Sequence, residues 1–309
     1  MADFGVPTAA PPAKIEELID GALMARLEAV DVVSRKIFAG KLQGERRSKK
    51  RGVSAEFADY RHYTHGDDLR FVDWNIYARL DKLFLKMFLE EEDLSLVIAI
   101  DTSASMHYGN PSKFDYCRRL AMAMGYVGLI NHNRVSLYGF GEGKVQPITG
   151  LRGRRRTREM GQWLLDLECG GRGDFTEAMK SIALSRQGRG VLLVISDYML
   201  KEGYESGLRY LAGGGYDCFC MQVLSPEEID PGKAGLAGDL RLTDREDGDE
   251  AEVTVSAALL ERYRKNLESW CGGLREYCVR RDIMHMMIDT ATPLEELMLE
   301  YFRKRGLLK

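Results

Sequence analysis

Hydrophobic and polar positions along the chain predict strands and helices in turn. After residue 90, five short apolar runs have the length and composition of buried strands. They lie at 94–100, 134–140, 191–197, 216–224 and 283–289. Segments with helical spacing separate them, at about 113–131, 153–167, 174–185, 200–212 and 256–280. Strands that alternate with helices predict a mostly parallel, doubly wound sheet with helices on both faces.

Three further elements modify this simple alternation. The segment 144–150 follows the run at 134–140 so closely that we expect a short antiparallel edge strand. A hairpin is expected near 240–255, with its turn at Asp247-Gly248. The segment 293–306 has acidic residues early and basic residues late, which is typical of a helix whose charges match its dipole.

The region before the sheet has a different pattern. From residue 14 to about 41, apolar residues recur at helical spacing and predict one long amphipathic helix. Residues 53–90 are rich in aromatic and charged side chains and predict turns, short strands and a short helix. We therefore expect a disordered lead-in at 1–13, a helix and small α+β module at 14–90, and the α/β domain at 91–309.

Composition and charge narrow the classes of function. A net charge of -3 over 309 residues gives no reason to expect nucleic-acid binding. Six cysteines without a C-x-x-C pair are typical of reduced core thiols. The sequence contains no run of 18 apolar residues, so we expect no membrane insertion and a cytoplasmic protein.

Polar residues follow the first predicted strand of the sheet directly, in the stretch 101-DTSASM-106. Ligands of open α/β sheets bind beyond the carboxyl ends of the strands. The spacing of two residues lets Ser103 and Ser105 point their hydroxyls toward the Asp101 carboxylate, and such oxygen ligands suit Mg²⁺. The alternative is that Asp101 and Ser103 form polar turns and cap a helix that begins near Ser112.

A second strand end carries Ser196 and Asp197. If the two strands are neighbours, Asp197 faces Asp101, and two carboxylates at that distance repel unless a cation lies between them. The alternative is that Asp197 caps the helix that follows.

These motifs together resemble the von Willebrand factor A fold, in which such residues form a metal ion-dependent adhesion site. The resemblance implies Mg²⁺, or Mn²⁺ or Ca²⁺, bound by Asp101, Ser103, Ser105 and Asp197. Gly173 takes the position where that fold normally supplies a Thr. Asp174, Thr176 or water would then fill the gap, although Asp174 with Glu177 also forms a helix capping box.

The stretch 56–93 resembles the bacterial family of domain of unknown function 58, with its E-F-x-x-x-R-x-Y, G-D-D-x-R-x-I-D-W and A-R motifs. Segments 34–52, 289–290 and 301–306 fit the same pattern. The matching positions are Glu56, Phe57, Arg61, Tyr63, Gly66, Asp67, Asp68, Arg70, Asp73, Trp74, Ala78 and Arg79. The resemblance implies an accessory partner of a MoxR-type AAA+ ATPase that acts in the assembly or maturation of client proteins.

Considered apart from this family resemblance, the charged residues of the stretch 56–93 indicate a compact structural network around Trp74. The alternative, a catalytic acid and base pair at Asp67 and Asp68, is less favoured. The members of the network would be Asp67, Asp68, Arg70, Asp73 and Arg79. Two basic clusters, at 46–51 and 152–158, are expected to be solvated, with docking of an acidic partner or of phosphate as the alternative.

Three functions follow from these features. The first is a non-enzymatic, divalent-metal-dependent protein-interaction module in which the partner completes the metal site. The second is a metal-dependent phosphoester hydrolase that uses the same carboxylates. The third is a metal-free scaffold in which Gly173 marks a degenerate site.

Overall fold

The computed structural model describes residues 10–34, 56–89, 94–143, 145–185, 188–212, 215–232, 238–243 and 250–309. The chain forms two compact units. The large unit comprises Met1–Ala39 and Leu94–Lys309, and the small unit comprises Gly40–Asp93.

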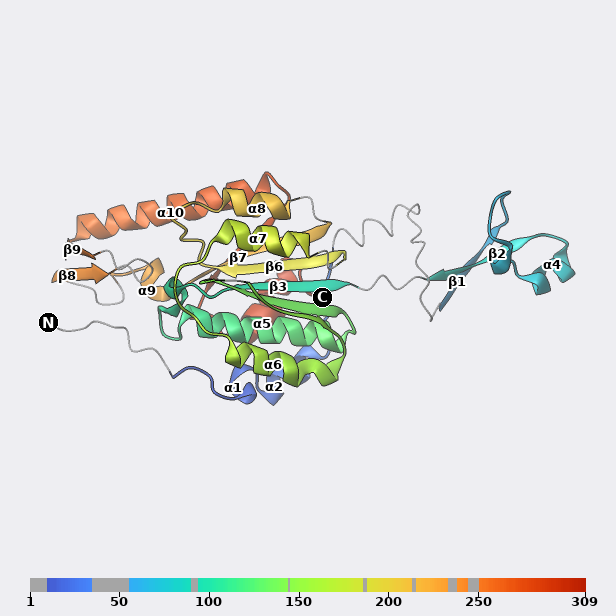
Figure 1. The fold of residues 1–309 in the computed structure, drawn as a ribbon, viewed down its shortest axis with the longest axis horizontal. Coiled ribbons are helices and arrows are strands. Elements are labelled where there is room, and N and C mark those ends of the chain that lie inside the picture. The colour runs from blue at the N-terminus through green and yellow to red at the C-terminus, as the bar shows by residue number, and fades with distance from the viewer. Residues whose placement is uncertain are drawn as a thin grey trace. The chain divides into compact units, whose positions relative to one another are not determined.

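A six-stranded sheet in the order β10-β7-β6-β3-β4-β5 forms the centre of the large unit (Figure 1). All neighbouring pairs are parallel except β4 and β5, which are antiparallel. The predicted parallel sheet and its antiparallel edge strand are therefore confirmed. The strands are β3 (Ser95–Asp101), β4 (Arg134–Phe140), β5 (Gln146–Leu151), β6 (Gly190–Ser196), β7 (Tyr216–Leu224) and β10 (Met284–Asp289).

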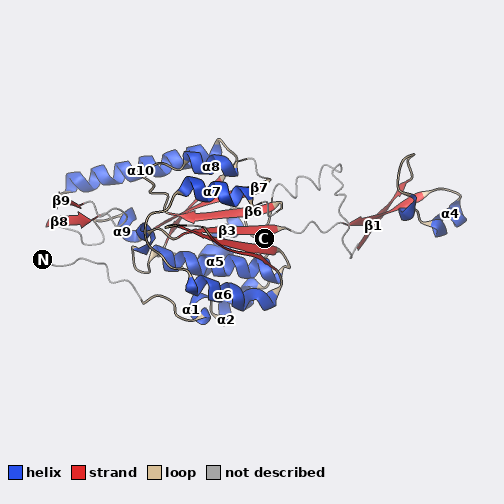
Figure 2. Ribbon diagram, in the orientation of Figure 1, coloured by secondary structure: helices blue, strands red, loops and turns tan. Residues whose placement is uncertain are grey.

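Helices cover both faces of this sheet, as Figure 2 shows. Two apolar cores result, because the central strands bury side chains on both sides. One face carries α5 (Lys113–Ile130), α6 (Thr157–Asp166) and the C-terminal helical turns α11 (Leu294–Glu296) and α12 (Phe302–Lys304). The other face carries α7 (Phe175–Leu184), α8 (Glu205–Leu211) and α10 (Ala257–Val279). The expected doubly wound, von Willebrand factor A-like architecture is confirmed.

The N-terminal region differs from the single long helix that its periodicity predicts. Two short helices, α1 (Ile15–Leu18) and α2 (Gly21–Leu27), are separated by Ile19 in an extended conformation. Asp20 interrupts the predicted helix, because its carboxylate accepts the Leu23 N–H at 2.7 Å and so caps a new helix, α2. Residues 35–41 of the expected helix lie outside the described part of the chain.

The domain boundary expected at residue 14 also needs correction. The helices α1 and α2 belong to the large unit, where Leu18 and Leu27 are fully buried in the same core as α5 and α6. Burial of these apolar side chains, rather than proximity in sequence, decides which unit the helices join. The small module therefore begins after the N-terminal helices.

The small unit contains the antiparallel strands β1 (Glu56–His62) and β2 (Phe84–Leu89). Between them lie the 3-10 turn η1 (Leu69–Phe71) and helix α4 (Trp74–Leu80). Asp73 caps α4 through the Asn75 N–H at 2.9 Å.

The expected charged network around Trp74 is instead a set of local pairs. Arg61 contacts Asp67 at 2.7 Å, and Arg70 contacts Asp68 at 2.5 Å. Trp74 is 57% exposed, so it is not the buried centre of these charged pairs.

The expected hairpin is present as β8 (Gly238–Thr243) paired with β9 (Glu250–Val255). Its turn at Asp247-Gly248 lies outside the described residues, as does the basic cluster at 46–51. A short helix that the sequence pattern does not predict, α9 (Pro226–Ile229), precedes the hairpin. All six cysteines are free thiols.

Candidate functional site at the carboxyl edge of the sheet

Asp101 and Asp197 lie at the same edge of the sheet. Asp101 is the last residue of β3, and Asp197 directly follows β6, the parallel neighbour of β3. Both side chains are buried, each with a relative exposure of 2%. The strand pairing therefore brings together the two carboxylates that the sequence places at strand ends.

Local hydrogen bonds fix the Asp101 carboxylate. Its Oδ1 accepts the Ser103 N–H at 2.9 Å, which is the turn expected for an Asp at this position. Its Oδ2 accepts the Ser196 hydroxyl at 2.6 Å. Burial and the nearby Asp197 charge raise the pKa of Asp101 from 3.8 to about 6. Ionised Asp101 is therefore held in an unfavourable electrostatic environment.

The two serines of the DTSASM stretch lie together. Ser103 Oγ and Ser105 Oγ are 3.1 Å apart, within hydrogen-bond distance of each other. Adjacent ligands of an octahedral Mg²⁺ with bonds of about 2.1 Å are roughly 3 Å apart, so this spacing fits a shared cation. The two hydroxyls therefore lie close to each other at the carboxyl end of β3.

Lys113 contributes a buried cation that sequence reasoning missed. Its Nζ donates to Asp197 Oδ2 at 2.6 Å and to Glu228 Oε1 at 2.5 Å, and its side chain is only 1% exposed. Burial alone would lower the pKa of Lys113, but the charges of Asp197 and Glu228 outweigh it and raise that pKa. The same partnership holds the pKa of Asp197 below its ordinary value despite burial.

The donor set of this site fits a divalent cation. Asp101, Asp197 and Glu228 supply three carboxylates, and Lys113 supplies one ammonium, so the fully ionised cluster retains two negative charges. The oxygens of Asp101, Ser103, Ser105 and Asp197 are hard ligands that suit Mg²⁺. Among the described residues, no group of three His, Cys, Asp or Glu side chains is arranged around a common point for a metal. Any site here therefore depends on the serine hydroxyls.

The third loop brings backbone, rather than a hydroxyl, to the site. Gly173 lines a small pocket with Asp101, Ser103 and Phe140. A Cβ at Gly173 would lie 2.5 Å from the Gly141 carbonyl oxygen, so the position excludes any side chain.

Neither proposed substitute for the missing Thr lines this pocket. Asp174 is exposed, and its Oδ1 accepts the Glu177 N–H at 2.9 Å, which caps α7. Thr176 lies in the first turn of the same helix. The structure therefore brings together Asp101, Ser103, Ser105 and Asp197 and leaves Asp174 in the capping role.

Two signals in the sequence point to the missed residues. Lys113 is the first residue of α5, after the capping Ser112, and the helix dipole disfavours a cation there. Glu228 completes the capping box of α9 with Ser225. Neither signal reveals that the two side chains meet, since they are 115 residues apart.

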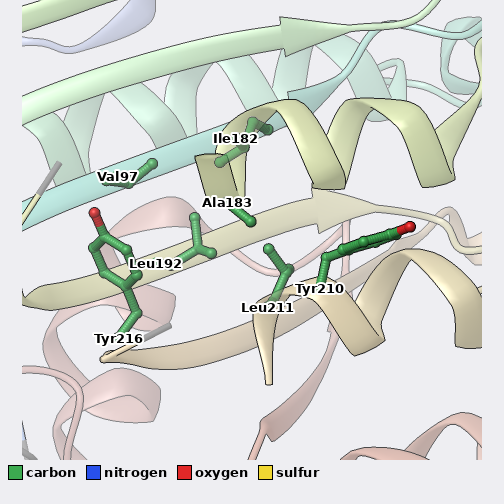
Figure 3. A pocket seen from close by; sticks show the side chains of 7 residues that line it. All are labelled: Val97, Ile182, Ala183, Leu192, Tyr210, Leu211 and Tyr216. Atoms are coloured by element: carbon green, nitrogen blue, oxygen red, sulfur yellow. The ribbon is translucent and has the colours of Figure 1, made fainter. Parts of the chain in front are cut away.

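A second pocket lies between α7, α8 and the sheet (Figure 3). Its lining is mainly apolar, with Tyr210 and Tyr216 as the polar exceptions. The other lining residues are Val97, Ile182, Ala183, Leu192 and Leu211. It lacks the charged groups that gather at the carboxyl edge, which makes the carboxyl edge the stronger candidate.

Polar contacts continue from the site to the outer strand β10. Gln222 Nε2 donates to the Asp197 carbonyl oxygen at 3.2 Å, and Gln222 Oε1 lies 3.0 Å from His285 Nε2. Burial, with smaller effects from Arg275 and Arg305, lowers the pKa of His285 from 6.5 to about 4. This histidine is therefore neutral in the folded protein at neutral pH.

We expect His285 to make the protein sensitive to mild acid. Its folded pKa lies below its unfolded pKa, so its contribution is complete above pH 6.5 and is lost as the pH falls toward 4. By pH 4.5, wild type should lose roughly 1–2 kcal/mol more stability than His285→Gln. Urea unfolding of both proteins at pH 7 and pH 4.5 measures this difference. Parallel pH profiles would contradict the prediction.

The Arg-rich segment 152–158 is exposed at the start of α6. Arg154 pairs with Glu28 at 2.8 Å, and Arg156 pairs with Glu159 at 2.9 Å. These are surface ion pairs of the kind expected for a solvated face. Within the described part of the chain, no helix combines the length and apolar character that a membrane crossing requires.

The fold is a von Willebrand factor A-like, doubly wound α/β sheet, with the polar residues that follow β3 and β6 at one edge. The chain belongs to the family described as "Protein of unknown function DUF58", whose model matches residues 59–269. The similarity that the motifs at 56–93 indicate is thereby confirmed.

Relatives and solved structures of several kinds are similar to this chain. The uncharacterized proteins Rv1480 of Mycobacterium tuberculosis and Mb1516 of Mycobacterium bovis are each 23% identical over 261 residues, covering 82% of this chain and 81% of the relative. An aerotolerance-related membrane protein from Bacteroides fragilis matches 68% of this chain and 99% of its own, with 15% identity and a TM-score of 0.41. The VWA domain of SpRpn10 matches 65% of this chain and 91% of its own, with 14% identity and a TM-score of 0.39.

Proposed function

We propose that this protein is a non-enzymatic protein-interaction module that depends on a divalent cation. Asp101, Ser103, Ser105 and Asp197 would hold the cation, with Mg²⁺ as the first candidate and Mn²⁺ or Ca²⁺ as alternatives. A bound cation would offer an open coordination position to a carboxylate of a partner protein. The observation that carries the proposal is the excess of two negative charges in a buried cluster beside paired serine hydroxyls.

The proposed partner is a MoxR-type AAA+ ATPase, together with a client protein, in the cytoplasm. This partner is the one that the resemblance of the motifs at 56–93 implies, and the DUF58 family model matches residues 59–269. The ATPase would supply energy, and this protein would couple that energy to the client.

The surface of the small unit also supports a role in protein binding. Leu69, Trp74, Tyr77 and Leu80 have relative exposures of 52%, 57%, 40% and 60%. Exposed apolar side chains gathered on one small unit are typical of surfaces that another protein covers.

Calorimetric titration with Mg²⁺ tests the cation site directly. We expect wild type to give a saturable binding heat and Asp101→Ala to bind at least about tenfold more weakly, because a ligand and its charge are lost. Asp174→Asn is the matched control, since it removes a nearby carboxylate while keeping the side chain that caps α7. Equal heats for wild type and Asp101→Ala would refute the proposed site.

Partner capture separates metal-dependent binding from a metal-free scaffold. We expect the co-expressed ATPase to copurify with wild type in Mg²⁺ and to be lost in chelator. Copurification that survives both chelator and Asp101→Ala would favour the scaffold instead.

A further inference from the structure

The Lys113 ammonium joins two carboxylates that come from separate parts of the sheet. Asp197 follows β6, and Glu228 belongs to α9 after the neighbouring strand β7. The exposed fractions of the Lys113, Asp197 and Glu228 side chains are 1%, 2% and 17%. Lys113 is therefore buried and in direct contact with Asp197, a proposed ligand of the cation.

Only the carboxylates explain a lysine at this position. Burial in a low-dielectric interior disfavours an ammonium, and so does the first turn of α5, where the helix dipole is positive. Two contacts of 2.6 and 2.5 Å to carboxylate oxygens compensate for both effects.

Lys113 and Glu228 also limit how Asp197 can turn. Asp197 Oδ2 accepts from Lys113, and its Oδ1 accepts the Met199 N–H at 3.0 Å. Glu228 is fixed in turn, because its Oε2 accepts the Ser225 N–H at 2.9 Å. The Glu228 carbonyl oxygen also accepts the Tyr263 hydroxyl at 2.8 Å, which ties this turn to α10.

We propose that Lys113 and Glu228 are positioning residues of the cation site, which hold the Asp197 carboxylate in a fixed orientation beside Asp101. This inference rests on the proposed function. Glu228 shares the ammonium with Asp197, so that Asp197 is not fully neutralised by Lys113. The arrangement leaves the cluster with the two negative charges that one divalent cation balances.

Substitution of both Lys113 and Glu228 distinguishes the effect of positioning on Mg²⁺ affinity from the effect of net charge. Lys113→Met removes one positive charge and Glu228→Gln removes one negative charge, so the double variant keeps the net charge of the cluster. If the pair positions Asp197, the double variant binds Mg²⁺ about tenfold more weakly than wild type, as for other groups that orient metal ligands. If only net charge matters, its affinity equals that of wild type, and our inference is overturned.

Glu228→Gln alone should also weaken Mg²⁺ binding by about tenfold, because Lys113 then pairs with Asp197 only. Glu227→Gln is the matched control, since it removes a carboxylate from the same helix, for which no contact with Lys113 is seen. An equal effect of both substitutions would show that long-range charge, not the Lys113 contact, sets the affinity. Affinities are compared by calorimetry at a temperature where circular dichroism shows every variant folded.

Thermal unfolding without metal gives a readout that does not depend on cation binding. Lys113→Met alone should lower the Tm most, because it leaves two buried carboxylates without their cation. Adding Glu228→Gln should restore part of that loss. If the Tm shift of the double variant equals the sum of the shifts of the two single variants, Lys113 and Glu228 do not interact, and the contact between them is contradicted. A wild-type protein without Mg²⁺ binding would refute the proposed function as well, whereas wild-type affinity in the double variant would overturn only the roles of Lys113 and Glu228.

Discussion

Asp101→Asn is expected to stabilise the metal-free protein while abolishing its Mg²⁺ binding. The ionised carboxylate of Asp101 is buried next to Asp197, which raises its pKa from 3.8 to about 6. An amide removes the repulsion and can still accept the Ser103 N–H. We expect a gain of roughly 1–2 kcal/mol in the free energy of unfolding at pH 7, after allowance for the altered contact with Ser196.

The pH dependence and the metal dependence of this gain check its cause. Because the folded pKa of Asp101 lies above the unfolded pKa, the cost of ionisation is absent below pH 3.8 and complete above about pH 6. The two proteins should therefore have similar stabilities near pH 4. Excess Mg²⁺ should raise the Tm of wild type and leave Asp101→Asn unchanged. A variant less stable than wild type in chelator at pH 7 would contradict the prediction.

The sheet could be predicted because its strands are buried on both faces. The runs around 94–100 and 191–197 are apolar without alternation, and their length and polar ends mark them as parallel strands. The positions of Asp101 and Asp197 follow from the strand ends alone. Their proximity follows from the direct pairing of β3 with β6.

Other parts of the site could not be read from local patterns. Lys113 and Glu228 meet only because the fold brings the start of α5 next to α9, which follows β7. Likewise, the periodicity of residues 14–41 does not show that Asp20 caps a second helix and interrupts the first. In both cases tertiary contacts or capping outweigh the hydrophobic period.

Trp74 shows a different limit of sequence reasoning. An aromatic residue among charged neighbours indicates a structural centre, yet its side chain is mostly exposed and packs edge-on against Tyr77. Periodicity identifies the apolar face of a helix but does not identify what covers it. Trp74, Tyr77 and Leu80 of α4 therefore do not form the interior of the small unit.

Gly173→Thr is expected to damage the site, although it restores the residue type that von Willebrand factor A-like domains normally have there. A Cβ at Gly173 would lie 2.5 Å from the Gly141 carbonyl oxygen and 2.7 Å from the Gly141 Cα. Gly141 is itself packed closely against Thr102, because a Cβ at Gly141 would lie 2.8 Å from the Thr102 carbonyl oxygen. We expect a loss of roughly 1–3 kcal/mol in the free energy of unfolding, as for other overpacked positions.

Mg²⁺ titration of Gly173→Thr then tests whether this chain tolerates a third hydroxyl. Displacement of the loop from Gly141 would also disturb Thr102, whose neighbours Asp101 and Ser103 are proposed ligands, so we expect weaker rather than tighter binding. Gly173→Ala is the matched control, because it places the same Cβ against Gly141 without adding a hydroxyl. Tighter binding without loss of stability would show that Gly173 is a vacant ligand position. The expected result would show instead that close contact between the two loops requires glycine at position 173.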